Sequence, residues 1–408
     1  MNLQKQAFIN TSGNIMYFIA LWLLMVISTK FMGYEAAGAI TLAMTVGNMI
    51  ATVQFYGVRS FQSSDIMFQY TPNDYIYARV ITVVIGLLIC VSFCFWMDYP
   101  SNLSLTIFLF MIIKSSESFS DALFGDFQRL GRLEIAGYSM FLRGIVITLF
   151  FVLSLCFFNK LNTALLLTSI GAVLILLLFD IPFHNSIIRG IKRINQRKSV
   201  GVLKICFPLF LSGIIVPIIV AFPRIILEHF YGVELLGFYG NVSTPALLLT
   251  TVAPTVLTVL LPDYGRLFNL RDYGKIRKIW GLSVIGTLVA GFICLICLFI
   301  FGRPVMAFIY TDQILPYVRY LYLILLAMVL NTLTICNNTV LVAIRKNSVI
   351  IMTSIIALVI CLVISFPLVR DYCINGAIAV LIITYGLQMM AQMTFLLRIW
   401  RSIKSEII

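Results

Sequence analysis

The chain has 408 residues, of which 61% are apolar and only 11% are charged. This balance is typical of membrane proteins and excludes a water-soluble globular domain. The formal net charge of +13 would suggest a nucleic-acid partner for a soluble protein, so the placement of the basic residues has to decide its meaning.

Apolar runs of about 20 residues, the length that crosses a bilayer as a helix, recur along the whole chain. In the first half we predict spans at 8–32, 36–57, 77–97, 102–124, 135–158 and 161–183. In the second half we predict spans at 205–229, 235–261, 279–302, 314–340, 347–369 and 373–398. The predicted fold class is therefore an all-α polytopic membrane protein of twelve transmembrane helices.

Most of the 29 lysines and arginines, Arg59 and Arg79 among them, fall on the cytoplasmic side if the N-terminus is cytoplasmic. This asymmetry satisfies the positive-inside rule, so we expect both termini in the cytoplasm. The excess of basic residues then reflects the membrane topology and does not indicate a nucleic-acid partner. Trp96, Trp280 and Trp400 fall at predicted span ends, where indole rings are expected at the membrane interface.

Two halves of the chain show weak internal similarity. The predicted outer turn GYEAAG at 33–38 recurs as GVELLG at 232–237, nearly half a chain later. Six helices per half is an even number, so both halves must face the same way, related by an axis along the membrane normal. We expect six-helix bundles at 1–183 and 205–408, a cytoplasmic linker at 184–204, and a central cavity.

Ionisable residues at bilayer depth are expensive and are therefore candidates for a functional site. Lys114, Glu117, Asp121 and Gln128 fall on one stripe of a helix that includes the 102–124 span. An antiparallel hairpin with the next span places Arg143 at the depth of Glu117, and we predict that these two residues pair. Such a pair is either structural or part of an ion-coupling or substrate-guiding site.

Arg224 and Glu228 lie near the outer end of the 205–229 span, which also contains three prolines that permit bends. They either form part of a gate or are an interfacial pair satisfied by lipid headgroups.

Other polar groups have simpler interpretations. Asn331, Thr334 and Asn338 share one face of a span and either line the inner mouth of the cavity or bond to a neighbouring helix. Asp180 and Asp263 lie at inner span ends, where we expect them to be solvated.

Several function classes lack their sequence signatures. There is no G-x-x-x-x-G-K-[ST] phosphate loop, and the two histidines have no metal-ligand spacing, so we expect neither ATP hydrolysis nor a metal or cofactor. Cys294 and Cys297 form a C-x-x-C within an apolar run, where we interpret them as packing residues. A membrane glycosyl polymerase or ligase usually needs a large outer domain, whereas every predicted outer loop is short. These patterns favour a transporter over an enzyme.

Four segments carry a resemblance to a known family: TSGN at 11–14, YGVRSFQSSD at 56–65, GDFQRLGRLEIAGYSMFLRG at 125–144, and FPRIILEHFYGVELLGFYG at 222–240. They resemble Wzx-type polysaccharide repeat-unit flippases of the multidrug/oligosaccharidyl-lipid/polysaccharide flippase superfamily. The resemblance implies a V-shaped pair of six-helix bundles in the bacterial inner membrane. It further implies that the chain carries an undecaprenyl-pyrophosphate-linked oligosaccharide to the outer leaflet, for O-antigen or capsule synthesis.

This resemblance gives the candidate residues expected roles. An anionic pyrophosphate needs cationic groups inside the membrane, and Lys114, Arg143, Arg224 and Arg59 are available. Glu117 or Asp121 would carry a coupling proton or sodium ion. Membrane lipid, a polysaccharide polymerase and chain-length proteins are the expected partners. The alternative is an ion-coupled small-molecule or drug exporter of the same superfamily.

Overall fold

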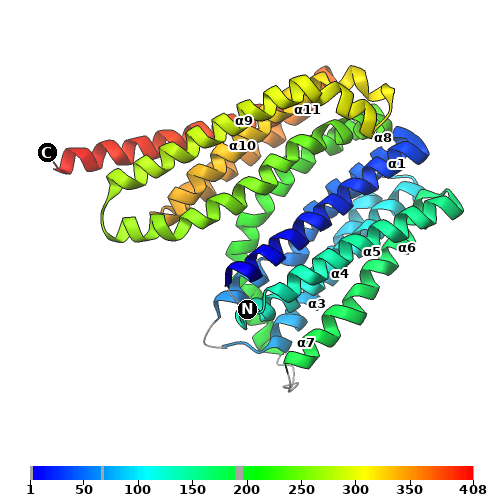
Figure 1. Cartoon of the computed structure of the whole chain (residues 1–408), viewed down its shortest axis with the longest axis horizontal. Helices are drawn as coiled ribbons and strands as arrows, with labels where there is room; N and C mark the ends of the chain where they lie inside the picture. Colours follow the sequence, from blue (N-terminus) through cyan, green and yellow to red (C-terminus); the bar gives the residue numbers. More distant parts are fainter. Residues whose placement is uncertain (1–2, 66–68, 189–195, 408) are drawn as a thin grey trace. The chain divides into compact units, whose positions relative to one another are not determined.

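The computed structural model describes residues 3–65, 69–188 and 196–407, and these ranges contain helices and no strand (Figure 1). The helices of the first part are α1 (Leu3–Phe55), α2 (Val58–Ser64), α3 (Pro72–Trp96), α4 (Ser101–Arg129), α5 (Glu134–Phe158), α6 (Leu161–Ile175), the π-helical turn η1 (Leu176–Asp180) and α7 (Ile181–Ile187). The second part contains α8 (Gln196–Asn269), α9 (Tyr273–Ile309), the 3-10 helix η2 (Asp312–Tyr317), α10 (Arg319–Ala343) and α11 (Asn347–Ile407).

Nine helices within the described ranges are long and apolar enough to cross a membrane. Three of them, α1, α8 and α11, contain one residue each with non-helical backbone angles, at Gly33, Gly232 and Cys373. These breaks lie at or beside three boundaries that the sequence predicts between consecutive spans. The predicted all-helical membrane fold is confirmed, whereas the count of twelve spans stays a prediction.

The breaks in α1 and α8 share one backbone conformation. Gly33 has φ 85° and ψ −173°, and Gly232 has φ 82° and ψ 171°. A side chain at such a positive φ would be strained, which explains why both turns contain glycine. The two residues occupy the same place in the GYEAAG and GVELLG repeats, so their equal geometry supports the internal similarity.

Two compact units divide the chain, an N-terminal unit of Met1–Pro217 and a C-terminal unit of Ile218–Ile408. Part of the predicted linker, residues 189–195, lies outside the described residues. The first turns of α8 belong to the N-terminal unit, where Val202 and Cys206 pack with Val58, Tyr75 and Ala78.

Helices α3, α4 and α5 of the N-terminal unit all pack against α1. The contact between α1 and α5 is close enough to bring backbones together, because a Cβ atom on Gly13 would overlap the backbone of Gly137. A Cβ atom on Gly137 would in turn meet the carbonyl oxygen of Ile9 at 2.6 Å. Small residues that permit such close contact are typical of helix packing in membranes.

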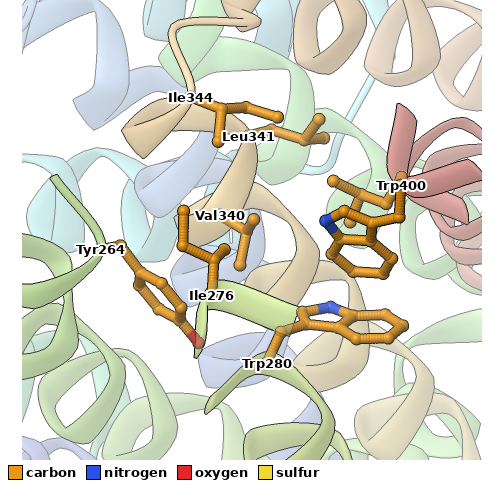
Figure 2. Packing of buried hydrophobic residues seen from close by; sticks show 8 residues of the cluster. Tyr264, Ile276, Trp280, Val340, Leu341, Ile344 and Trp400 are labelled. Carbon is orange, nitrogen blue, oxygen red and sulfur yellow. The ribbon is translucent and has the colours of Figure 1, made fainter. Parts of the chain in front are cut away.

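The C-terminal unit has an apolar cluster at the ends of its helices (Figure 2). Trp280 of α9 and Trp400 of α11 lie with ring centroids 4.6 Å apart, and the Trp280 indole nitrogen donates to Asn337 of α10 at 2.9 Å. Both tryptophans are buried among neighbouring helices, and their position at the membrane interface stays a prediction. Packing against each other removes both rings from the surface. Trp96 is 80% exposed.

Candidate functional site

The predicted polar stripe lies on α4, which is the most buried span of the N-terminal unit. Four serines, Ser115, Ser116, Ser118 and Ser120, accompany it and are all buried. Because serine is small and bonds to other groups, these residues allow neighbouring helices and long side chains to approach. The charged groups around α4 form separate clusters at different heights.

Lys114 and Glu117 form the first cluster. The Lys114 ammonium lies 2.8 Å from the Glu117 carboxylate, which also accepts a hydrogen bond of 2.7 Å from the Tyr17 hydroxyl of α1. The same ammonium lies 5.7 Å from the centre of the Tyr17 ring. One carboxylate therefore holds a cation and a phenol in place, and the side chain of Glu117 is still 16% exposed.

The predicted Glu117–Arg143 ion pair is wrong. Arg143 of α5 pairs with Asp180 at 3.3 Å, and its guanidinium also donates to Ser116 at 3.2 Å and to Ser120 at 2.6 Å. Ser120 donates to the same Asp180 oxygen. Glu117 is instead bonded by Lys114 of its own helix, which is closer in sequence than any partner on α5.

Asp180 was expected at a solvated helix end, and this too is wrong because its side chain is fully buried. It belongs to the π-helical turn η1, directly before α7. Pro182 has no backbone N–H to donate to residue 178, and its ring would collide with the carbonyl four residues earlier. The wider turn accommodates the proline there, and Asp180 lies within this turn.

Two arginines share the carboxylate of Asp121. Arg79 of α3 lies 2.9 Å from one oxygen and Arg59 of α2 lies 3.2 Å from the other. Arg79 is completely buried and also donates to the Gln54 carbonyl and the Ser118 hydroxyl. The Arg59 side chain is 28% exposed and reaches Gln128 at 3.2 Å. We call Arg59, Arg79 and Asp121 the arginine triad, and it has one excess positive charge.

A buried chain of polar groups follows at the end of α4. His184 of α7 lies 2.9 Å from Asp126, which pairs with Arg129 at 3.0 Å. Arg129 lies 3.5 Å from Asp65. Burial alone would raise the pKa of Asp65, but the backbone amides of Gln69 and Tyr70, the Tyr75 hydroxyl and Arg129 hold that pKa below its ordinary value. This chain fixes α2, α4 and α7 to one another.

The remaining candidates, Arg224 and Glu228, lie in the C-terminal unit. The Arg224 guanidinium lies 3.5 Å from the Ser243 hydroxyl and 5.5 Å from the centre of the Tyr239 ring. The Glu228 side chain is buried. The predicted pairing of Arg224 with Glu228 stays a prediction.

The amides on α10 engage neighbouring helices. Asn338 accepts a hydrogen bond from Gln392 of α11 at 3.0 Å, while Thr334 donates to its own helix at Leu330. The alternative in which these groups bond to a neighbouring helix is therefore supported for Asn338. In the described part of the chain, no three His, Cys, Asp or Glu side chains gather in a way that could hold a metal ion.

Sequence reasoning did not identify Arg79 and Asp180 as members of the charged clusters. The position of Arg79 inside a helix could have been predicted from the sequence. Thr71 and Asp74 form a capping box that starts α3 at Pro72, so Arg79 lies two turns inside the helix. The pairing of Asp180 depends on the π-helical turn, which Pro182 signals only weakly.

Known proteins share sequence similarity or the overall fold with this chain. The chain is 23% identical over 336 residues to the capsular polysaccharide biosynthesis protein CapF of Staphylococcus aureus, covering 81% of this chain and 84% of the relative. The solved structure of the lipid II flippase MurJ, in an inward closed conformation, matches with a TM-score of 0.77 at 13% identity over 95% of this chain and 87% of that chain.

A mutant of the Vibrio cholerae MATE transporter VcmN matches with a TM-score of 0.64 at 14% identity, covering 98% of this chain and 97% of that chain. No protein-family model matches the chain. These likenesses show that the chain has the fold of these solved transporters. Function has to be argued from the site.

Proposed function

We propose that this chain, whose fold is that of MurJ and the MATE transporters, is a flippase for undecaprenyl-pyrophosphate-linked oligosaccharide repeat units in surface polysaccharide synthesis. The observation that carries the proposal is the arginine triad. It combines an excess positive charge with a partly exposed guanidinium, whereas Lys114 and Arg143 are each matched by one carboxylate. The similarity to a capsule biosynthesis protein supports the same class of substrate.

The charge of the triad favours an anionic ligand. Buried charges are normally paired, because an unpaired buried charge costs several kcal/mol. Asp121 can neutralise only one of its two arginines, so one positive charge remains to attract the negative charge of a diphosphate. A guanidinium offers parallel N–H donors that match phosphate oxygens, and Arg59 is the more accessible of the two.

The other clusters fit a transport cycle in which the two units rock and expose the bound headgroup to each side in turn. Lys114 and Arg143 are each matched by a carboxylate, so the arginine triad would supply the positive potential. Glu117 is bonded to a cation and a phenol, and a proton or sodium ion on this carboxylate would release both. The undecaprenyl tail would stay in the membrane lipid. A polysaccharide polymerase and chain-length proteins would receive the flipped unit.

The experiment is complementation of a flippase-null strain that carries the matching sugar locus. Wild type should restore surface polysaccharide, and Arg59→Gln should abolish it at equal membrane abundance. The matched control is Arg132→Gln, which removes an exposed arginine paired only with Glu134 at 3.7 Å and should leave export unchanged. Wild-type export by Arg59→Gln would overturn the role of the triad.

A drug exporter is the second candidate, because MATE transporters share the fold. The excess positive charge disfavours cationic drugs as substrates. Efflux of a cationic dye from intact cells separates the two functions. Dye efflux without rescue of surface polysaccharide by well-expressed wild type would replace the flippase proposal.

A further inference from the structure

Two arginines of the C-terminal unit have a backbone conformation that normally favours glycine. Arg271 follows α8 with φ 57°, and Arg345 follows α10 with φ 59°. At both helix ends, the backbone N–H groups of the arginine and of the next residue donate hydrogen bonds to carbonyl oxygens of the helix. Arg271 and Asp272 donate to Phe268 and Leu267 at 3.0 Å each. These hydrogen bonds close the end of the helix. They require the residue at the arginine position to have a left-handed backbone conformation.

The second closure repeats the pattern. Arg345 donates to Val342 at 3.0 Å, and Lys346 donates to Leu341 at 2.8 Å. In the N-terminal unit the end of α4 uses the same closure with a glycine, Gly131, at φ 68°. Glycine would adopt the conformation without the steric cost that a Cβ atom brings. Both closures therefore hold a charged side chain at a position that glycine would occupy at lower cost, as Asp98 does at the end of α3 with φ 53°.

Both arginines are exposed, and they lie among other exposed basic residues at the same helix ends. We call this set the basic face, and it consists of Arg266, Arg271, Lys275, Arg277, Lys278, Arg345, Lys346 and Arg398. Two acidic residues, Asp263 and Asp272, lie in the same segments, and Asp272 is engaged by Lys275 at 2.9 Å. Neither Arg271 nor Arg345 has an ion pair among the described residues.

The basic face has a rigid base. The apolar cluster shown in Figure 2 joins Tyr264 of α8, Ile276 and Trp280 of α9, Ile344 directly after α10, and Trp400 of α11. Arg345 directly follows Ile344, and Phe268, which packs against the cluster, accepts the Arg271 hydrogen bond. The two arginine backbones are therefore held on one packed platform, and their side chains project from fixed points.

We propose that the basic face binds the phosphate headgroups of anionic lipids in the cytoplasmic leaflet, with Arg271 and Arg345 as the principal contacts. The sequence assigns these helix ends to the cytoplasmic side, where apolar spans reach headgroup level. Guanidinium groups at that depth donate to phosphate oxygens while their stems stay against apolar surface. Trp280 and Trp400 are buried in the apolar cluster beneath the face, so the exposed arginines are the groups that would contact the lipid phosphates.

The test uses the purified full chain in neutral detergent, titrated with phosphatidylglycerol and, separately, with phosphatidylcholine, with bound lipids counted by native mass spectrometry. The informative variant is Arg271→Gly together with Arg345→Gly, because glycine suits both backbone positions and the helices still end there. We expect at least a tenfold loss of phosphatidylglycerol binding and a thermal unfolding temperature equal to or above that of wild type.

The matched control replaces Arg303 and Arg370 with alanine, since both are exposed arginines at the opposite ends of helices in the same unit. This control should keep wild-type binding, and inorganic phosphate at equal concentration should not displace the lipid. The proposal is overturned if the glycine variant binds phosphatidylglycerol like wild type, if the control loses as much binding, or if inorganic phosphate competes fully.

Discussion

Individual charged residues around α4 each have a distinct set of partners. Lys114 is matched by Glu117 and Arg143 by Asp180, whereas Arg59 and Arg79 share Asp121. Matched buried pairs hold helices together, and we propose that the unmatched group attracts the ligand. This difference in charge balance separates the proposed ligand site from structural pairs.

The Arg143–Asp180 pair should therefore behave as a structural unit. Both side chains are completely buried, so Arg143→Gln or Asp180→Asn alone leaves an uncompensated charge and should destabilise the fold by about 3–5 kcal/mol. The double variant should recover a large part of this loss, because it removes both charges. Unfolding in detergent, followed by circular dichroism, measures the three variants. Additive losses would show that the two residues stabilise the fold independently.

Glu117 should instead affect transport more than stability. Glu117→Gln keeps the side-chain shape but removes the charge that holds Lys114 and accepts the Tyr17 hydrogen bond. If this carboxylate carries the coupling ion, transport by the variant should no longer respond to a proton or sodium gradient. Tyr17→Phe, which keeps the carboxylate, should retain the response. A gradient response unchanged in Glu117→Gln would remove this residue from coupling.

At the scale of elements, the sequence predicts the positions of the membrane spans well. It predicts poorly which charged residues pair with one another. The length of the apolar runs located helices such as α4 and α5 to within several residues, because a helix that crosses a membrane needs an apolar run of this length. The partner of Arg143 could not be predicted, because it depends on the π-helical turn that buries Asp180. The short helix α2, which positions Arg59, also escaped prediction, since seven residues give too little periodicity.

The contact between α1 and α5 offers a direct test of element packing. Gly137→Val would place a branched side chain against the backbone at Ile9 and Asn10, so α1 must move away from α5. We expect a destabilisation of about 1–3 kcal/mol, measured as a lower thermal unfolding temperature in detergent. Gly265→Val is the comparison, because a Cβ atom there meets no neighbour. Equal effects of both substitutions would contradict close packing.

For the whole molecule, two units joined through α8 carry different kinds of charge. The N-terminal unit contains the arginine triad and the paired clusters around α4. The C-terminal unit contains Arg224 beside Tyr239 and presents the basic face on its apolar cluster. The two units share the same backbone turn at Gly33 and Gly232 but differ in the charged residues that they contain.

The central claim is the translocation of an anionic lipid-linked oligosaccharide, and reconstitution tests it most directly. The purified chain would be placed in vesicles that contain a fluorescent undecaprenyl-pyrophosphate-linked oligosaccharide, and an impermeant quencher would report how much reaches the opposite leaflet. We expect wild type to translocate the substrate and Arg59→Gln to resemble protein-free vesicles, with Arg132→Gln equal to wild type. Translocation no faster than in protein-free vesicles, while a cationic dye is transported, would contradict the account.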